Sequence, residues 1–138
     1  IQAREVAARE RGDRMGWTQE NMWSLAWALG FEQKPAPTAP LIDGDVVGPM
    51  LEFLPQHDGS IAELLEHADP RSEAEVLDLE DLFYCAHNAV RSAQNGDPST
   101  VPPDFHPIMN GGAVHERRHA LTWMISPGVS WEDTDLST

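Results

Sequence analysis

The most regular hydrophobic pattern of the chain runs over residues 72–94. Apolar residues recur there at every third or fourth position, which is the spacing of one face of an α-helix. Ser72 with Glu75 forms a capping box at the start, and Asn95-Gly96 is a stop signal at the end. The pattern therefore predicts one long amphipathic helix. Its expected buried face consists of Val76, Leu79, Leu82, Phe83, Ala86, Ala89, Val90 and Ala93.

Four shorter segments also favour helices. Apolar residues fill most sides of the chain from Thr18, a good N-cap, to Gly30, so this helix should be buried on most sides. Two short helices are expected over residues 46–54 and 60–68, and a last one over residues 113–125. The apolar side chains that the last helix is expected to bury are Val114, Leu121, Trp123, Met124 and Ile125.

The connections between these segments are rich in proline. Residues 33–40 hold three prolines and residues 98–107 hold four, without apolar periodicity, which is typical of extended loops. Alternation with a period of two does not persist beyond a few residues, so no strand is predicted. We expect an all-α fold, a compact single-domain helical bundle of about five helices joined by proline-rich loops. Residues 18–138 should form this domain, after an N-terminal segment of residues 1–17 that is truncated at its start.

Charge narrows the classes of partner. The chain has 138 residues and a formal net charge of −14 at pH 7. This charge argues against nucleic acid as a direct partner, because phosphate binding needs a basic surface, and against anionic membranes. It favours a basic protein as partner. One cysteine, no signal peptide and no apolar run near the length of a membrane span predict a cytoplasmic location.

The sequence His-Glu-Arg-Arg-His at residues 115–119 has the spacing of a zinc-binding helix. His115 and His119 would lie on one helix face, with Glu116 as general base. Two full positive charges, Arg117 and Arg118, would then stand beside the cation. A third ligand would have to come from Glu132, Asp133 or Asp135, and no second-shell partner is evident. We therefore predict no metal site and no cofactor, and interpret the histidines as an exposed pair.

A second polar group lies on the long helix. Asp81, Tyr84, His87 and Arg91 follow one another at helical spacing and could form an acid–base pocket. The alternative that we favour is structural. In it, Asp78 or Asp81 forms salt bridges with Arg117 or Arg118 of the last helix and so joins the two helices.

The lone thiol belongs to the same helix. Cys85 lies at turn spacing from Asp78 and Asp81, and nearby carboxylates disfavour a nucleophilic thiolate. We expect it to be a small core residue.

Three stretches in order resemble a bacterial family catalogued as domain of unknown function 4272. Residues 22–30 are similar to a helix that ends in Trp-Ala-Leu-Gly, residues 75–93 to the central block of the family, and residues 114–124 to its closing block. The resemblance covers about residues 20–135, and the N-terminal part of the family pattern is absent or blurred. In this chain Cys85 replaces an Arg of the family and Asn88 a Trp. The family brings no reaction, substrate or ligand.

The resemblance also distinguishes the residues of the closing block that belong to the family pattern from those that do not. Glu116, Arg117 and Arg118 are part of the family pattern, whereas the two flanking histidines are not. This implies an internal ion-pair network between the last two helices.

Three functional hypotheses remain open at this point. The leading one is a non-catalytic acidic domain that binds a basic protein, as an inhibitor or an immunity protein does. The alternative is a hydrolase, which would use either the zinc motif or the Asp81, Tyr84, His87 and Arg91 group. A third hypothesis is an obligate oligomer formed through the helix of Trp23 and Trp27.

Overall fold

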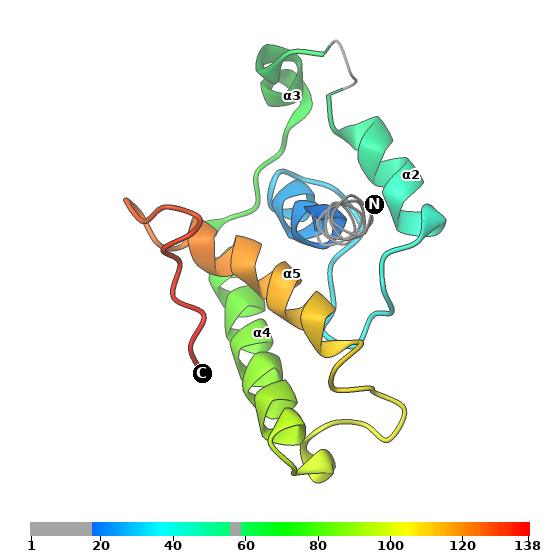
Figure 1. Cartoon of the computed structure of the whole chain (residues 1–138). Coiled ribbons are helices and arrows are strands. Elements are labelled where there is room, and N and C mark those ends of the chain that lie inside the picture. Colours follow the sequence, from blue (N-terminus) through cyan, green and yellow to red (C-terminus); the bar gives the residue numbers. More distant parts are fainter. Residues whose placement is uncertain (1–17, 56–58) are drawn as a thin grey trace, which may run out of the picture.

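A computed structural model describes residues 18–55 and 59–138 (Figure 1). These residues contain helices and turns and no β-strand, which confirms the predicted all-α class. The expected N-terminal segment of residues 1–17 lies outside the described residues. Residues 18–28 are helical, and the elements that follow are α2 (Gly44–Phe53), α3 (Ile61–His67), α4 (Glu73–Gln94), the short 3₁₀ helix η1 (Pro98–Thr100) and α5 (Gly111–Met124).

Helix α4 forms where its capping signals predict it. The Ser72 hydroxyl accepts a hydrogen bond from the Glu75 amide at 3.2 Å, and the Glu75 carboxylate accepts one from the Ser72 amide at 3.4 Å. This reciprocal pair satisfies two amides that a helix N-terminus leaves without partners. At the other end Gly96 takes a positive φ of 109°, which a residue without a side chain adopts readily.

Helices α4 and α5 pack against each other and carry much of the core (Figure 1). Gly111 permits a close approach at the start of α5, because a Cβ atom there would lie 2.7 Å from Cγ1 of Val90. Helix α5 begins two residues earlier than predicted. The buried residues of this core are Trp27, Val76, Leu79, Phe83, Val90, Val114 and Leu121.

The helix of residues 18–28 lies between this core and a second one. Trp27 belongs to the first core, whereas Trp23, with Phe31 and Met50, belongs to the second. The helix is therefore buried on most sides, as predicted. Thr18 is already helical and so is not the N-cap that we expected.

The C-terminal end of this helix is tied to the segment that precedes α4. The carbonyls of Ala28 and Leu29 accept hydrogen bonds from the amides of Arg71 and Asp69, at 2.8 and 2.9 Å. Gly30, with φ of 117°, allows the approach, since a Cβ atom there would lie 2.9 Å from the Asp69 carbonyl oxygen. These bonds satisfy carbonyls that a helix end exposes.

Helix α2 tolerates an internal proline. Pro49 has no amide hydrogen to donate to the Asp45 carbonyl, and the Gln33 side-chain amide donates to that carbonyl instead, at 3.2 Å. The helix begins at Gly44 behind the N-cap Asp43, two residues before the predicted start.

Helix α3 has the predicted N-cap, Ser60, but buries no residue. It lies at the periphery in Figure 1, so the fold departs from a regular bundle at this point.

Three expectations about the core are wrong. Leu82 is 51% exposed and Trp123 is 37% exposed, and Cys85 is also exposed. Leu82 and Trp123 lie beside the contact faces of their helices, because α4 and α5 are covered over a narrower arc than the apolar pattern suggested. Cys85 lies on the side of α4 that faces solvent. His87, Arg117 and Arg118 occupy buried positions instead.

Candidate functional site

Among the described residues the most buried charged side chain is that of Arg117, in the middle of α5. Its side chain is 0% exposed, and Nε donates to the Glu20 carboxylate at 2.7 Å. Nη1 donates to the carbonyls of Ala36 and Ala39 at 3.0 and 2.9 Å, and Nη2 donates to that of Pro40 at 2.7 Å. A proline-rich loop offers few amide donors, and the guanidinium supplies donors to three of its carbonyls. Arg117 thus holds the loop of residues 36–40 against α5.

Glu20 completes this network from the helix of residues 18–28. Its second carboxylate oxygen accepts from the Ile42 amide at 2.8 Å, and its side chain is 2% exposed. The Arg117 guanidinium also lies over the Trp23 ring, 4.9 Å from the centroid. The Ser24 hydroxyl donates to the Arg117 carbonyl at 2.9 Å. A buried ion pair with this many partners fixes three segments in one arrangement.

Arg118 forms a second network, toward α4 and the C-terminal segment. Nη1 contacts Nδ1 of His87 at 2.9 Å and donates to the Leu136 carbonyl at 2.8 Å. Nε lies 3.7 Å from the Glu80 carboxylate, an ion pair without a hydrogen bond, and has no hydrogen-bond partner among the described residues. The Thr122 hydroxyl donates to the same Glu80 oxygen at 3.0 Å. The C-terminal segment is therefore held on α5 by a buried arginine.

The predicted partners of the two arginines are corrected by these contacts. We expected Asp78 or Asp81, but Glu20 and Glu80 carry the pairing, and both aspartates are exposed and make no ion pair with a described residue. Glu80 is on the α4 side that faces α5, whereas Asp78 and Asp81 lie outside that contact. Of the two arginines only Arg118 pairs with α4, whereas Arg117 pairs with the helix of residues 18–28.

Three histidines lie close together where α4 and α5 pack against each other: His87 of α4, and His115 and His119 of α5. The ring centroids of His87 and His115 are 5.2 Å apart, and those of His115 and His119 are 6.2 Å apart. His119 stacks on Trp131 at 4.0 Å, and its Nε2 contacts the Trp131 carbonyl at 2.8 Å. His119 thus contacts the C-terminal segment rather than solvent alone.

Burial decides the protonation of two of these rings. It lowers the pKa of His87 to about 4, with smaller contributions from His115 and the nearby arginines. Burial likewise lowers the pKa of His115, although the adjacent Glu116 opposes that effect. Neutral His87 can accept the hydrogen bond that Arg118 donates. Glu116 itself accepts from the Asn21 side chain at 3.1 Å.

The zinc motif does not form a metal centre in the described part of the chain. No group of three or more His, Cys, Asp or Glu side chains there is placed to hold a metal ion. His115 and His119 are neighbours on α5, but no third side chain of the described residues is placed to complete a ligand set with them.

The acid–base group on α4 is not assembled either. His87 is buried against Arg118, and the Tyr84 ring lies under the Arg118 guanidinium, 4.9 Å from it. Arg91 is exposed, and its Nη1 donates to Gln94 at 3.3 Å. Asp81 faces solvent. The four residues therefore do not converge on one reaction site.

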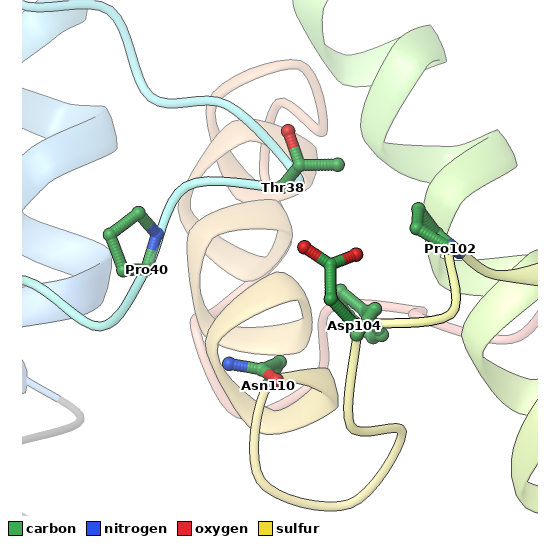
Figure 2. A pocket seen from close by; sticks show the side chains of 6 residues that line it. Thr38, Pro40, Pro102, Asp104 and Asn110 are labelled. Atoms are coloured by element: carbon green, nitrogen blue, oxygen red, sulfur yellow. The ribbon is translucent and has the colours of Figure 1, made fainter.

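A cleft lies between the two proline-rich loops (Figure 2). It has a volume of about 290 Å³ and is lined by Thr38, Pro40, Pro102, Asp104, Phe105 and Asn110. A second, more apolar hollow of about 180 Å³ shares Thr38, Pro102 and Phe105 with it and extends to α4. We call the two hollows the loop cleft. Sequence reasoning missed it, because proline-rich loops carry no periodicity that predicts how they meet.

Fold and site together define the class of this protein, an acidic all-α domain whose last helix is anchored by two buried arginines. The chain belongs to the family described as Domain of unknown function (DUF4272), whose pattern matches residues 3–134. The match begins at residue 3, earlier than the range of about residues 20–135 over which the sequence resembled the family. No curated protein and no solved structure matches the chain. None of the helices in the described ranges combines the length and hydrophobicity required to span a membrane.

Proposed function

We propose that this domain is a non-catalytic binder of a basic protein, as an inhibitor or an immunity protein is. The observation that carries the proposal is that three described arginine side chains are engaged by other groups of the protein. Arg117 and Arg118 are buried in ion pairs, and Arg71 is engaged by Glu75 and by the backbone carbonyls of Trp27 and Phe31. The acidic groups stay mostly at the surface, so the described part of the chain presents a predominantly negative face to solvent.

One face of α4 combines negative charge with apolar contact area. We define the acidic α4 face by Leu77, Asp78, Asp81, Leu82 and Cys85, all of them exposed. Their spacing places them on one side of the helix. Exposed leucines beside carboxylates suit a protein interface, in which apolar contacts hold the partner and charge increases the association rate.

Cys85 permits a direct test, because it is the single cysteine and lies within this face. The full chain carrying benzophenone-maleimide on Cys85 would be incubated with a lysate of the cells that make it, at about 50 mM salt, and then irradiated. We expect one dominant basic protein to be crosslinked. The yield should fall at least about fivefold at about 0.5 M salt, because screening weakens charge complementarity.

Matched variants separate this face from the overall charge. Replacing Asp78 and Asp81 by lysine should abolish the crosslink, whereas replacing Glu132 and Asp133 by lysine changes net charge equally and should preserve it. Crosslinked proteins that are not basic, an equal loss in both variants, or no crosslink at low salt would each contradict the proposal.

A further inference from the structure

Asp104 places an uncompensated charge at the mouth of the loop cleft. Figure 2 shows its carboxylate pointing across the cleft toward Thr38. It makes no hydrogen bond or ion pair with any residue in the described ranges. The Thr38 hydroxyl also makes no hydrogen bond with a described residue, and of the Asn110 side chain only the oxygen is engaged, which accepts from the His106 amide at 2.8 Å. At the mouth the Asp104 carboxylate and the Thr38 hydroxyl can accept hydrogen bonds from a ligand, and the Thr38 hydroxyl and the Asn110 side-chain nitrogen can donate to it. Asp104 is the charged residue among those that line the cleft, so the charge at the mouth is negative.

The floor of the loop cleft is apolar. Beyond Phe105 and Pro102 it reaches Ala86 and Ala89 of α4 and Val101. Small alanine side chains leave this floor open where larger residues would fill it. A ligand that suits the cleft therefore has an apolar body of about one ring next to a polar head.

Both walls of the loop cleft are fixed before any ligand arrives. Arg117 holds the carbonyls of residues 36, 39 and 40 on one side. On the other side the Thr100 hydroxyl donates to the Ala89 carbonyl at 2.7 Å, and the Gln94 side chain donates to the Pro107 carbonyl at 3.0 Å. Prolines further restrict both loops. A preformed cleft loses little entropy when it binds a small molecule.

From these observations we propose that the loop cleft binds a small organic amine, with the ammonium group at Asp104 and an aromatic or aliphatic body over Phe105 and the α4 alanines. The negative net charge of the chain likewise favours a cationic ligand. The loop cleft shares no residue with the acidic α4 face, so this proposal is independent of the proposed protein partner.

Phenethylamine is a suitable probe, because it is cationic at neutral pH and has one ring. Its binding to the full chain would be compared by isothermal titration calorimetry with that of 2-phenylethanol, the neutral analogue, and phenylacetate, the anionic one. We expect phenethylamine to bind at least about fivefold more tightly than the alcohol at low salt, since a charged group strengthens the contact with a carboxylate, and phenylacetate not to bind.

Two variants test the position of the ligand. Asp104→Asn should reduce the preference for the amine to within about twofold, because the amide keeps the shape and removes the charge. Asp133→Asn makes the same change in net charge on the exposed C-terminal segment and should leave the preference intact. Ala89→Leu should weaken the amine and the alcohol alike by filling the floor, and the melting temperature of each variant establishes that it is folded.

Three outcomes would overturn the proposal. They are an absence of phenethylamine binding at about 5 mM, equal binding of amine and alcohol, and an equal effect of Asp104→Asn and Asp133→Asn. The last outcome would mean that amines are attracted by the overall charge and not held in the loop cleft.

Discussion

At the scale of single residues, Arg117 shows how a charge can be retained inside a small domain. Removing a guanidinium from water is costly, and the structure offsets that cost with one carboxylate and three carbonyl oxygens. Glu20 depends on this arrangement as much as Arg117 does, because its carboxylate would otherwise be buried without a counter-ion.

This dependence predicts a large effect of removing one partner. Arg117→Met keeps the volume and should lower the free energy of unfolding by about 3–5 kcal/mol, because Glu20 and the loop carbonyls lose their donors. Urea unfolding measures the change. Arg91→Met, at an exposed position, should stay within about 0.5 kcal/mol.

The double variant Glu20→Gln with Arg117→Met tests whether the uncompensated Glu20 carboxylate causes the loss of stability in Arg117→Met. It should be more stable than Arg117→Met alone, because it removes the uncompensated carboxylate. Simple additivity of the two single losses would contradict the coupling.

The lowered pKa of His87 predicts a pH effect on stability. A histidine in the unfolded chain takes up a proton near pH 6.5, whereas burial lowers the pKa of folded His87 to about 4. The contribution of His87 is thus fully present above pH 6.5 and is lost as the pH falls toward 4. Its full size is on the order of 3 kcal/mol.

Comparison with His87→Gln isolates the pH-dependent contribution of His87 to stability. Glutamine does not titrate, and its side-chain oxygen can still accept a hydrogen bond from Arg118. Urea unfolding at several pH values between 4 and 7 should show the wild-type chain losing more stability than the variant. Parallel curves would exclude this assignment, and an NMR titration of His87 would test its pKa directly.

At the scale of helices, α4 shows that apolar periodicity predicts the helix but not which of two adjacent apolar residues is buried. Leu82 and Phe83 are adjacent and both apolar, yet Leu82 is 51% exposed and Phe83 is 0% exposed. The 100° turn between neighbouring positions places one beside the contact with α5 and the other within it.

A pair of alanine substitutions tests this orientation. Phe83→Ala should cost about 3–5 kcal/mol of unfolding free energy, because it leaves a cavity in the core of α4 and α5. Leu82→Ala should cost less than about 1 kcal/mol, since its side chain stays largely in water in the folded state. Thermal or urea unfolding of the two variants provides the measurement, and similar losses would mean that α4 is rotated from the position described.

At the scale of the whole molecule, charge repulsion opposes folding. A net charge of −14 on a chain of this size repels itself more strongly in the compact state than in the unfolded one. Increasing NaCl from about 10 mM to about 0.3 M reduces the screening length from roughly 30 Å to below 10 Å and should raise the free energy of unfolding.

Arg117→Met provides a control for this effect. Its stability should increase with salt by a similar amount, because the buried ion pair is little screened while the surface repulsion is the same. A wild-type stability that falls with salt would mean that surface ion pairs dominate the electrostatics.

The helix ends and the ion pairs differ in how well the local sequence predicts them. The capping box of Ser72 and Glu75, the N-cap Ser60 and the stop at Gly30 were predictable, because each acts within a few residues. The partners of the arginines were not. Asp78, Glu80 and Asp81 are carboxylates within four residues of one another, and the rotation of α4 against α5 selects Glu80.

The sequence by itself therefore determined the helical class, most of the helix ends and the acidic character, since these follow from short-range hydrogen bonding and composition. Tertiary packing decided that Glu20, 97 positions from Arg117, becomes its counter-ion, and that two proline-rich loops enclose a cleft. Such contacts join segments far apart in the chain, and their geometry depends on how the helices pack, which no local pattern encodes.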